Sequence, residues 1–292
     1  MERFMIVDTR QNIDKLKAEL DSTFKHASAG NVVLSISEDP EEKLAYLLCG
    51  HPKDASTQFK RFIAEAIAGL IINSIESMLA YNIFEQNYCF SVSEREDIFQ
   101  EILRHTGERE KSSGCTFLYR IHRRNAILNK LLDYIATTDM IIIKGFIMFR
   151  LKDYLVELAE IVDKAVDSFL LEKDYNEFIL LLRRLTKTNE SKVDFVHVVF
   201  YPEGFFKLFD KRRKVIKSGL LEKAGDEQDQ EELSYDDLLI NLLVSLVPKK
   251  IIFHSCGNER TAVVKKMIRD IFSGQLKECT GCYLCVSRGR GC

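Results

Sequence analysis

Apolar residues recur every three or four positions through most of the middle of this chain, which is the spacing of an amphipathic helix. The longest such pattern runs from Gly145 to Arg184, and charged side chains occupy its opposite face. A charged step at 172–174 interrupts the pattern, which therefore predicts two helices that pack on each other. The residues expected in the core of this helix pair are Leu151, Leu155, Leu158, Val162, Val166, Phe169, Phe178 and Leu182.

Three more helices are predicted ahead of this pair. The first runs from Ser56 to Asn87, and the second starts at a capping-box pair formed by Ser93 and Glu96. The third spans Thr116 to Thr137, and its polar face carries basic residues that we expect to lie in water. These basic residues are Arg120, His122, Arg123 and Arg124. Together the segments predict an all-helical middle.

At both ends of the chain the apolar spacing changes to the alternation of β-strands. Near the N-terminus two strands flank a helix, which predicts a small β-α-β unit, and Leu44–Cys49 fits either a strand or a short helix. Near the C-terminus the runs Val193–Phe200 and Phe205–Phe209 predict a β-hairpin. The elements expected after the hairpin are a helix at 234–246, a strand at 250–254, a helix at 258–272 and an extended segment at 275–278.

These elements predict an α+β protein with a mainly helical middle. We expect three parts, namely a β-α-β unit at 1–54, a helical domain at 55–190 and a C-terminal α/β part at 191–292. The third part contains the hairpin, an acidic linker at 223–232 and a cysteine-rich tail.

Composition narrows the classes of partner and the compartment. With 42 basic and 44 acidic side chains the net charge is −2, so a charged partner must be met by a local patch. The most apolar long window, Phe62–Phe84, contains Glu65 and Glu76, which argues against a membrane span. The N-terminal segment carries charge within its first three residues and no long apolar run, so we expect a cytoplasmic protein.

Cysteines cluster near the C-terminus, where Cys279, Cys282 and Cys285 follow one another at intervals of three. Three thiolates within seven residues can converge on one metal ion through a turn at the glycine between the first two. Zinc takes four ligands, and Cys256 and His254 at the end of a predicted strand are candidates for the missing one, with Cys292 as the alternative nearer in the chain. They would reach the triplet only if the last extended segment runs alongside that strand.

Two other interpretations of the triplet remain open. The same spacing begins a bacterial iron–sulfur motif, although the Cys-Pro pair that completes that motif is absent. The cysteines would alternatively be unligated thiols on a frayed tail. We expect one metal ion, zinc rather than an iron–sulfur cluster, in a structural role.

The densest basic run is Lys211, Arg212, Arg213 and Lys214, which follows the aromatic residues of the predicted hairpin. Basic and aromatic side chains together can grip phosphates and stack on bases, so the run is a candidate nucleic-acid site. The other interpretation is a solvated edge of the hairpin that deters pairing with other strands.

Several motifs in the second half of the chain carry a resemblance to a known family. They are Gly145-Phe146, Phe149-Arg150-Leu151, Tyr154, Val162-Asp163, Ala165-Val166-Asp167, Tyr175-Asn176-Glu177-Phe178-Ile179, Leu181-Leu182-Arg183, Asp236-Asp237-Leu238-Leu239, Pro248-Lys249-Lys250-Ile251-Ile252, His254, Cys279-Thr280-Gly281-Cys282 and Leu284-Cys285. In these positions the chain resembles the YtxC-like family of sporulation proteins. The resemblance implies a link to sporulation, and no catalytic residue comes with it.

The chain contains no G-x-S-x-G, P-loop, H-E-x-x-H or strand-linked G-x-G-x-x-G motif. Three classes of function remain: an interaction or scaffold protein of the sporulation programme, a nucleic-acid-binding protein and a metalloenzyme. We expect the first, with a protein partner and a structural metal site, and the metalloenzyme and nucleic-acid-binding classes stay as alternatives.

Overall fold

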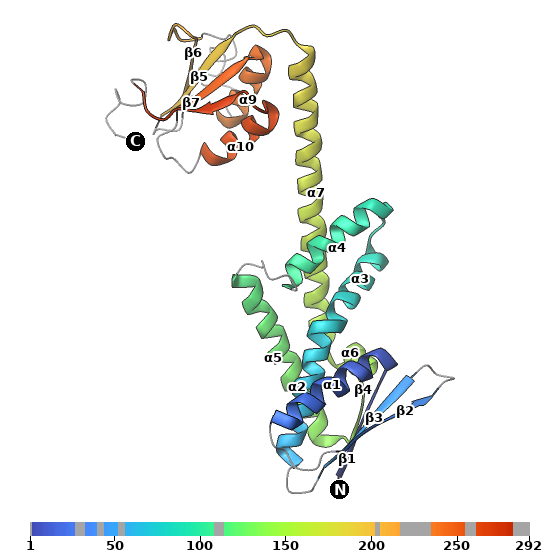
Figure 1. Cartoon of the computed structure of the whole chain (residues 1–292). Helices are drawn as coiled ribbons and strands as arrows, with labels where there is room; N and C mark the ends of the chain where they lie inside the picture. Colours follow the sequence, from blue (N-terminus) through green and yellow to red (C-terminus); the bar gives the residue numbers. More distant parts are fainter. Residues whose placement is uncertain are drawn as a thin grey trace, which may run out of the picture. The chain divides into compact units, whose positions relative to one another are not determined.

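The computed structural model describes residues 2–26, 33–39, 44–51, 56–107, 114–201, 205–216, 235–254 and 261–282. Contacts within the chain divide it into two compact units, Met1–Leu171 and Glu172–Cys292. Each unit has one small mixed β-sheet (Figure 1). Each unit also has its own apolar core.

The sheet of the first unit has the strand order β2-β3-β1-β4. Its strands are β1 (Glu2–Asp8), β2 (Val33–Asp39), β3 (Leu44–His51) and β4 (Met140–Ile142), and helix α1 (Arg10–His26) follows β1. The predicted β-α-β segment is present, but β3 lies between its two strands and is antiparallel to both. Leu44–Cys49 is thus a strand with both edges paired. No periodic pattern marks β4, a three-residue strand parallel to β1.

Helices make up most of the first unit. They are α2 (Ser56–Leu70), the π-helical turn η2 (Ile71–Ile75), α3 (Glu76–Asn87), α4 (Val92–Thr106), α5 (Gly114–Thr137) and α6 (Ile143–Arg150). The predicted Ser93–Glu96 cap is wrong by two residues, because α4 begins at Val92 and its capping box is formed by Ser91 and Glu94. Ser93 already lies within the helix.

One helical stretch, Gln58–Asn87, is long and apolar enough to cross a membrane by length and composition. However, 61% of its most apolar window is buried inside the protein, and the core helix of a soluble protein passes the same test. Side chains such as Ile63, Ile67 and Ile71 belong to the core of the first unit. The absence of a membrane span stays a prediction.

Not all basic side chains of α5 are exposed to solvent. The expectation that they lie in water is wrong for Arg123. Arg123 is 4% exposed, and its guanidinium donates to the carboxylate of Glu76, which is 2% exposed. Arg120 is half-buried and donates to the side-chain oxygen of Asn73. The opposite charge on α3 compensates Arg123, and a sequence pattern cannot show this because the partners are 47 residues apart.

Helix α7 (Lys152–Thr188) is one continuous element, so the predicted break at 172–174 is wrong. Charged residues in an exposed helix position do not end a helix, and this segment contains neither glycine nor proline.

Most of the expected core residues in and just before α7 are confirmed. Leu151, Leu158, Val162 and Val166 are buried in the core of the first unit, and Leu155 and Phe169 pack against it. In the second unit Leu182 packs against the core beside Ile179. Phe178 is 47% exposed and its placement in the core was wrong, because Tyr175, Ile179 and Leu182 form the face of α7 that packs on the second unit.

The sheet of the second unit has the strand order β6-β5-β7-β8. Its elements are β5 (Phe195–Phe200), β6 (Phe206–Phe209), α9 (Tyr235–Leu246), β7 (Lys250–His254), α10 (Thr261–Ile271) and β8 (Leu276–Glu278). Strands β5 and β6 form the predicted antiparallel hairpin, whereas β5, β7 and β8 run parallel. The protein is therefore α+β, as predicted. The division into parts at 54 and 190 stays a prediction, and the linker at 223–232 lies outside the described residues.

Candidate metal centre

The sheet of the second unit places His254 at the end of β7, on the face opposite the helices. Strand residues alternate between faces, and Val196, Val198, Ile251 and Phe253 belong to the apolar core shared with α9 and α10. His254 follows Phe253 and therefore points to the other face, where it is 4% exposed. A polar ring this deeply buried needs polar partners.

Strand β8 brings the first cysteine to this histidine. It runs parallel to β7, with Glu278 paired to Phe253, and the backbone N–H of Cys279 donates to the carbonyl of Phe253 over 3.0 Å. The last segment thus runs alongside β7, which is the condition under which the sequence predicted that the two ends meet.

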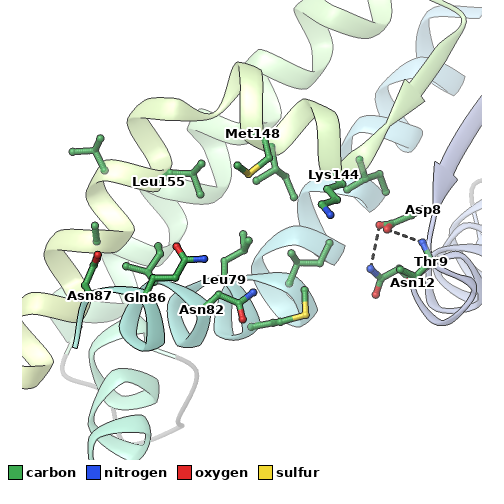
Figure 2. Close-up of a pocket in the computed structure, with 17 residues that line it drawn as sticks. Asp8, Thr9, Asn12, Leu79, Asn82, Gln86, Asn87, Lys144, Met148 and Leu155 are labelled. Atoms are coloured by element: carbon green, nitrogen blue, oxygen red, sulfur yellow. Dashed lines mark hydrogen bonds between the residues drawn. The ribbon is translucent and has the colours of Figure 1, made fainter. Parts of the chain in front are cut away.

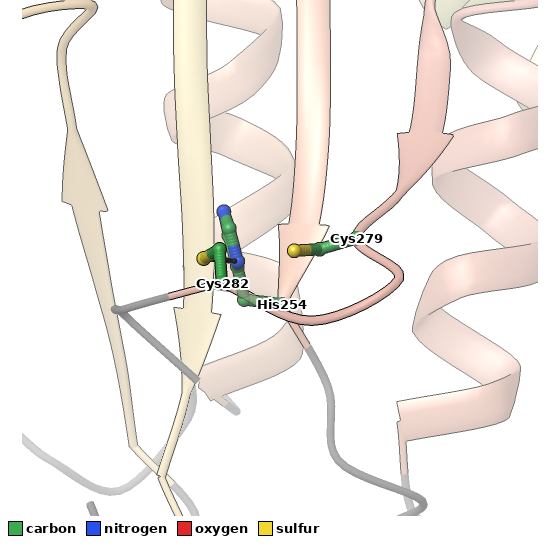
Figure 3. A group of neighbouring side chains, drawn as sticks. All are labelled: His254, Cys279 and Cys282. Carbon is green, nitrogen blue, oxygen red and sulfur yellow. Dashed lines mark hydrogen bonds between the residues drawn. The ribbon is translucent and has the colours of Figure 1, made fainter. Parts of the chain in front are cut away.

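A turn at Gly281 returns the chain to His254. Gly281 has a φ of 125°, a backbone conformation that favours glycine because a Cβ would strain it. After this turn the Sγ of Cys282 lies 3.5 Å from Nδ1 of His254. One ligand atom from each of His254, Cys279 and Cys282 lies within 4.8 Å of the other two (Figure 3).

His197 on β5 also belongs to this site, although no sequence motif marks it. Its Nδ1 lies 3.0 Å from Nε2 of His254, on the same face of the sheet. A ligand histidine usually makes a hydrogen bond with its second ring nitrogen, which fixes its tautomer. The available signal was the position of His197 in a strand that pairs with the strand of His254, but only the register reveals the contact.

Burial and neighbouring positive charge favour the neutral form of both rings. Burial, together with the neighbouring His197 and Arg213, lowers the pKa of His254 to about 4. Burial and Arg213 also lower the pKa of His197. A neutral imidazole keeps a lone pair available for a metal, as coordination requires.

The three ligand atoms fit a small, tetrahedral metal ion. Two thiolate sulfurs on a tetrahedral zinc, each about 2.3 Å from the metal, lie about 3.8 Å apart. The observed grouping, within 4.8 Å, is compatible with this spacing, and a mixed imidazole and thiolate set is typical of zinc. The predicted ligands Cys256 and Cys285 lie outside the described residues.

The predicted basic run forms a turn after β6. Arg213 and Lys214 donate backbone N–H groups to the carbonyl and the carboxylate of Asp210, and Arg213 has a positive φ of 62°. All four side chains, Lys211, Arg212, Arg213 and Lys214, are exposed. The charge of Arg213 contributes to the lowered pKa of both His197 and His254. Nucleic-acid binding by the run stays a prediction.

Comparison with known proteins identifies one family. The model of the YtxC-like family matches residues 61–277. The chain is similar to the uncharacterized protein YtxC of Bacillus subtilis (strain 168), with 20% identity over 218 residues that cover 75% of this chain and 76% of the relative. No solved structure matches the chain significantly. The matched range includes His197 and His254 and ends before Cys279, so the match does not test the cysteine cluster.

Proposed function

This chain belongs to the YtxC-like family, and we propose that it is an interaction protein whose second unit is completed by a structural metal ion bound to His254, Cys279 and Cys282. The observation that carries the proposal is the meeting of one imidazole nitrogen and two sulfurs from segments that lie more than twenty residues apart. For the fourth position we propose Cys285, which repeats the interval between the first two cysteines.

A structural role fits the site better than a catalytic one. A catalytic zinc keeps an open coordination position and needs a nearby base. Glu278 is the carboxylate next to the cluster, and it is paired with Lys265 at 3.2 Å and with Arg269 at 3.1 Å. These pairs hold β8 on α10 and engage both oxygens of the carboxylate.

The metal would fasten the end of the chain to the sheet. Strand β8 has only three residues, and the segment after it is rich in glycine and arginine, so little apolar surface holds it down. Metal binding supplies folding free energy directly. The exposed guanidinium of Arg213 would offset part of the negative charge of the thiolates.

A protein partner is supported by apolar side chains on the second half of α7. Phe178, Leu181 and Leu185 are each about half exposed, at helix positions three and four residues apart. An exposed apolar stripe of this kind is typical of an interaction surface. The proposed setting is a sporulating cell, which rests on the family resemblance, and the proposed compartment is the cytoplasm.

Elemental analysis of anaerobically purified protein tests the metal proposal. We expect one zinc per chain in the wild type, none in Cys282→Ser, and one in Cys89→Ser, which removes an exposed cysteine of the first unit. Cobalt in place of zinc should give the absorption of a tetrahedral thiolate site. A brown protein with visible absorbance would indicate an iron–sulfur cluster instead of zinc. Wild-type protein without metal would refute the proposal.

The role of His197 is tested by His197→Phe. If Nδ1 of His254 binds the metal, its Nε2–H donates to Nδ1 of His197, and loss of that acceptor should weaken zinc binding about 10–100-fold. Competition with a chromogenic chelator measures the affinity. The matched control is His122→Phe, an exposed histidine on α5, which should leave the affinity unchanged. Equal affinities for the two variants would show that His197 does not position the ligand.

A further inference from the structure

The first unit contains a pocket of about 690 Å³ that is separate from the candidate metal centre. Helix α3 forms one wall, and α6 with the first turns of α7 forms the other (Figure 2). The volume lies within the range of about 300–1,000 Å³ that is usual for small-molecule sites.

The pocket is lined mostly by apolar side chains. The apolar lining includes Leu79 and Ile83 from α3 and Ile147 from α6. Three large apolar side chains of the lining are exposed to solvent, namely Met78, Met148 and Val156. Leaving these groups in water is unfavourable, and methionine adapts its shape to many apolar ligands. The lining therefore suits a hydrocarbon chain.

One end of the pocket is polar, and it lies where the parallel strands β1 and β4 end. Asp8, at the end of β1, is 7% exposed, and its carboxylate accepts from the backbone N–H of Thr9 at 2.7 Å and from the amide of Asn12 at 3.1 Å. Burial raises the pKa of Asp8, and the charge of Lys144 opposes that rise. Both carboxylate oxygens are thus engaged within the protein.

Lys144 is the cation available to a ligand at this end. Among the described residues that line the pocket, only Asp8 and Lys144 are ionisable. Lys144 is exposed in the first turn of α6, and in the described part of the chain no carboxylate forms an ion pair with its amine. In Figure 2 the amine lies between Asp8 and the apolar section, and the amides of Asn82, Gln86 and Asn87 follow the other wall without adding charge.

We propose that this pocket binds one amphiphilic molecule with a single hydrocarbon chain and an acidic head group, the chain along α3 and the head at Lys144. The wall from Ile75 to Asn87 is about 18 Å long at 1.5 Å per residue. A peptide helix, about 10–12 Å across with its side chains, is a much thicker occupant than a single extended hydrocarbon chain. A single extended chain fits.

Titration calorimetry with dodecanoate tests the proposal on the full-length protein. We expect saturable binding of one molecule per chain, and weaker binding of dodecyltrimethylammonium, which has the same chain and the opposite charge. Lys144→Gln should weaken dodecanoate binding about fivefold, as expected for one partly exposed ion pair, and should not weaken binding of the cationic amphiphile. Lys152→Gln, an exposed lysine outside the pocket, is the control.

A second pair of variants tests the location. Val156→Phe fills the pocket from an exposed position, so it should reduce dodecanoate binding at least tenfold without disturbing the core. Glu157→Phe adds the same ring one residue away, outside the lining, and should bind as the wild type does. Circular dichroism verifies that all variants are folded.

Three results would overturn the proposal. The first is the lack of saturable dodecanoate binding. The second is equal affinity of Val156→Phe and Glu157→Phe for dodecanoate. The third is binding of the protein to vesicles of anionic phospholipid without binding of monomeric dodecanoate. The last result would indicate that the exposed apolar side chains contact a membrane and do not line a ligand site. None of these results bears on the metal site, which lies in the other unit.

Discussion

Glu76→Gln is expected to lower the free energy of unfolding of the first unit by about 3–5 kcal/mol, the cost of breaking a buried charge pair. Glu76 and Arg123 form two hydrogen bonds of 2.9 and 3.1 Å, and both side chains are almost fully buried. Without the carboxylate, the guanidinium would stay buried with its charge uncompensated. Among the described residues Arg123 also donates to Thr106, but that carbonyl carries no compensating charge.

The pair also connects several helices of the first unit. Arg123 on α5 reaches the carbonyl of Thr106 at the end of α4, and the hydroxyl of Tyr154 on α7 donates to Glu76 at 2.9 Å. Burial raises the pKa of Tyr154, so its hydroxyl stays protonated and keeps donating. Removing the carboxylate therefore breaks contacts to α5 and α7 at once.

Urea unfolding followed by circular dichroism measures this loss. The control is Glu65→Gln, which breaks the exposed pair of Arg61 and Glu65 on α2, and it should cost only about 0.3–0.5 kcal/mol. The double variant Glu76→Leu with Arg123→Met should recover much of the stability, because it leaves no unpaired charge. A cost for Glu76→Gln as small as that of the control would show that the pair is solvated in solution.

Leu158→Ala is expected to cost about 2–5 kcal/mol, the usual range for removing a fully buried leucine. Leu158 is 0% exposed on α7 and lies within the core of the first unit. Leu171→Ala is the matched control, because the same side chain is 71% exposed on the same helix. It should change stability by about 0.5 kcal/mol or less.

Phe178→Ala should resemble the control rather than Leu158→Ala, with a cost of about 1 kcal/mol or less. Its ring is 47% exposed, and alanine is a better helix former. Unfolding by urea compares the three variants under one condition. A large loss for Phe178→Ala would mean that a partner or a second copy covers this face.

The sequence by itself determined the elements whose signal is local. The three-and-four spacing of Leu151, Leu158, Val162 and Val166 identified a buried helix face, and alternation identified the hairpin and strand β7. Such patterns are visible in the sequence because the side chains on one face of a helix or strand contact the same surface and are therefore apolar at regular intervals. The spacing of the cysteines likewise identified a candidate metal cluster from a short segment.

Only the tertiary structure decided which distant residues meet. Sheet register places His197 beside His254, and the parallel course of β8 brings Cys279 and Cys282 to the same point. Tertiary packing also turns Arg123 toward Glu76 and leaves Phe178 in solvent, although both sit in helices that the sequence predicted. The physical reason is that helical periodicity sets which residues share a face, whereas burial depends on what the rest of the chain packs against that face.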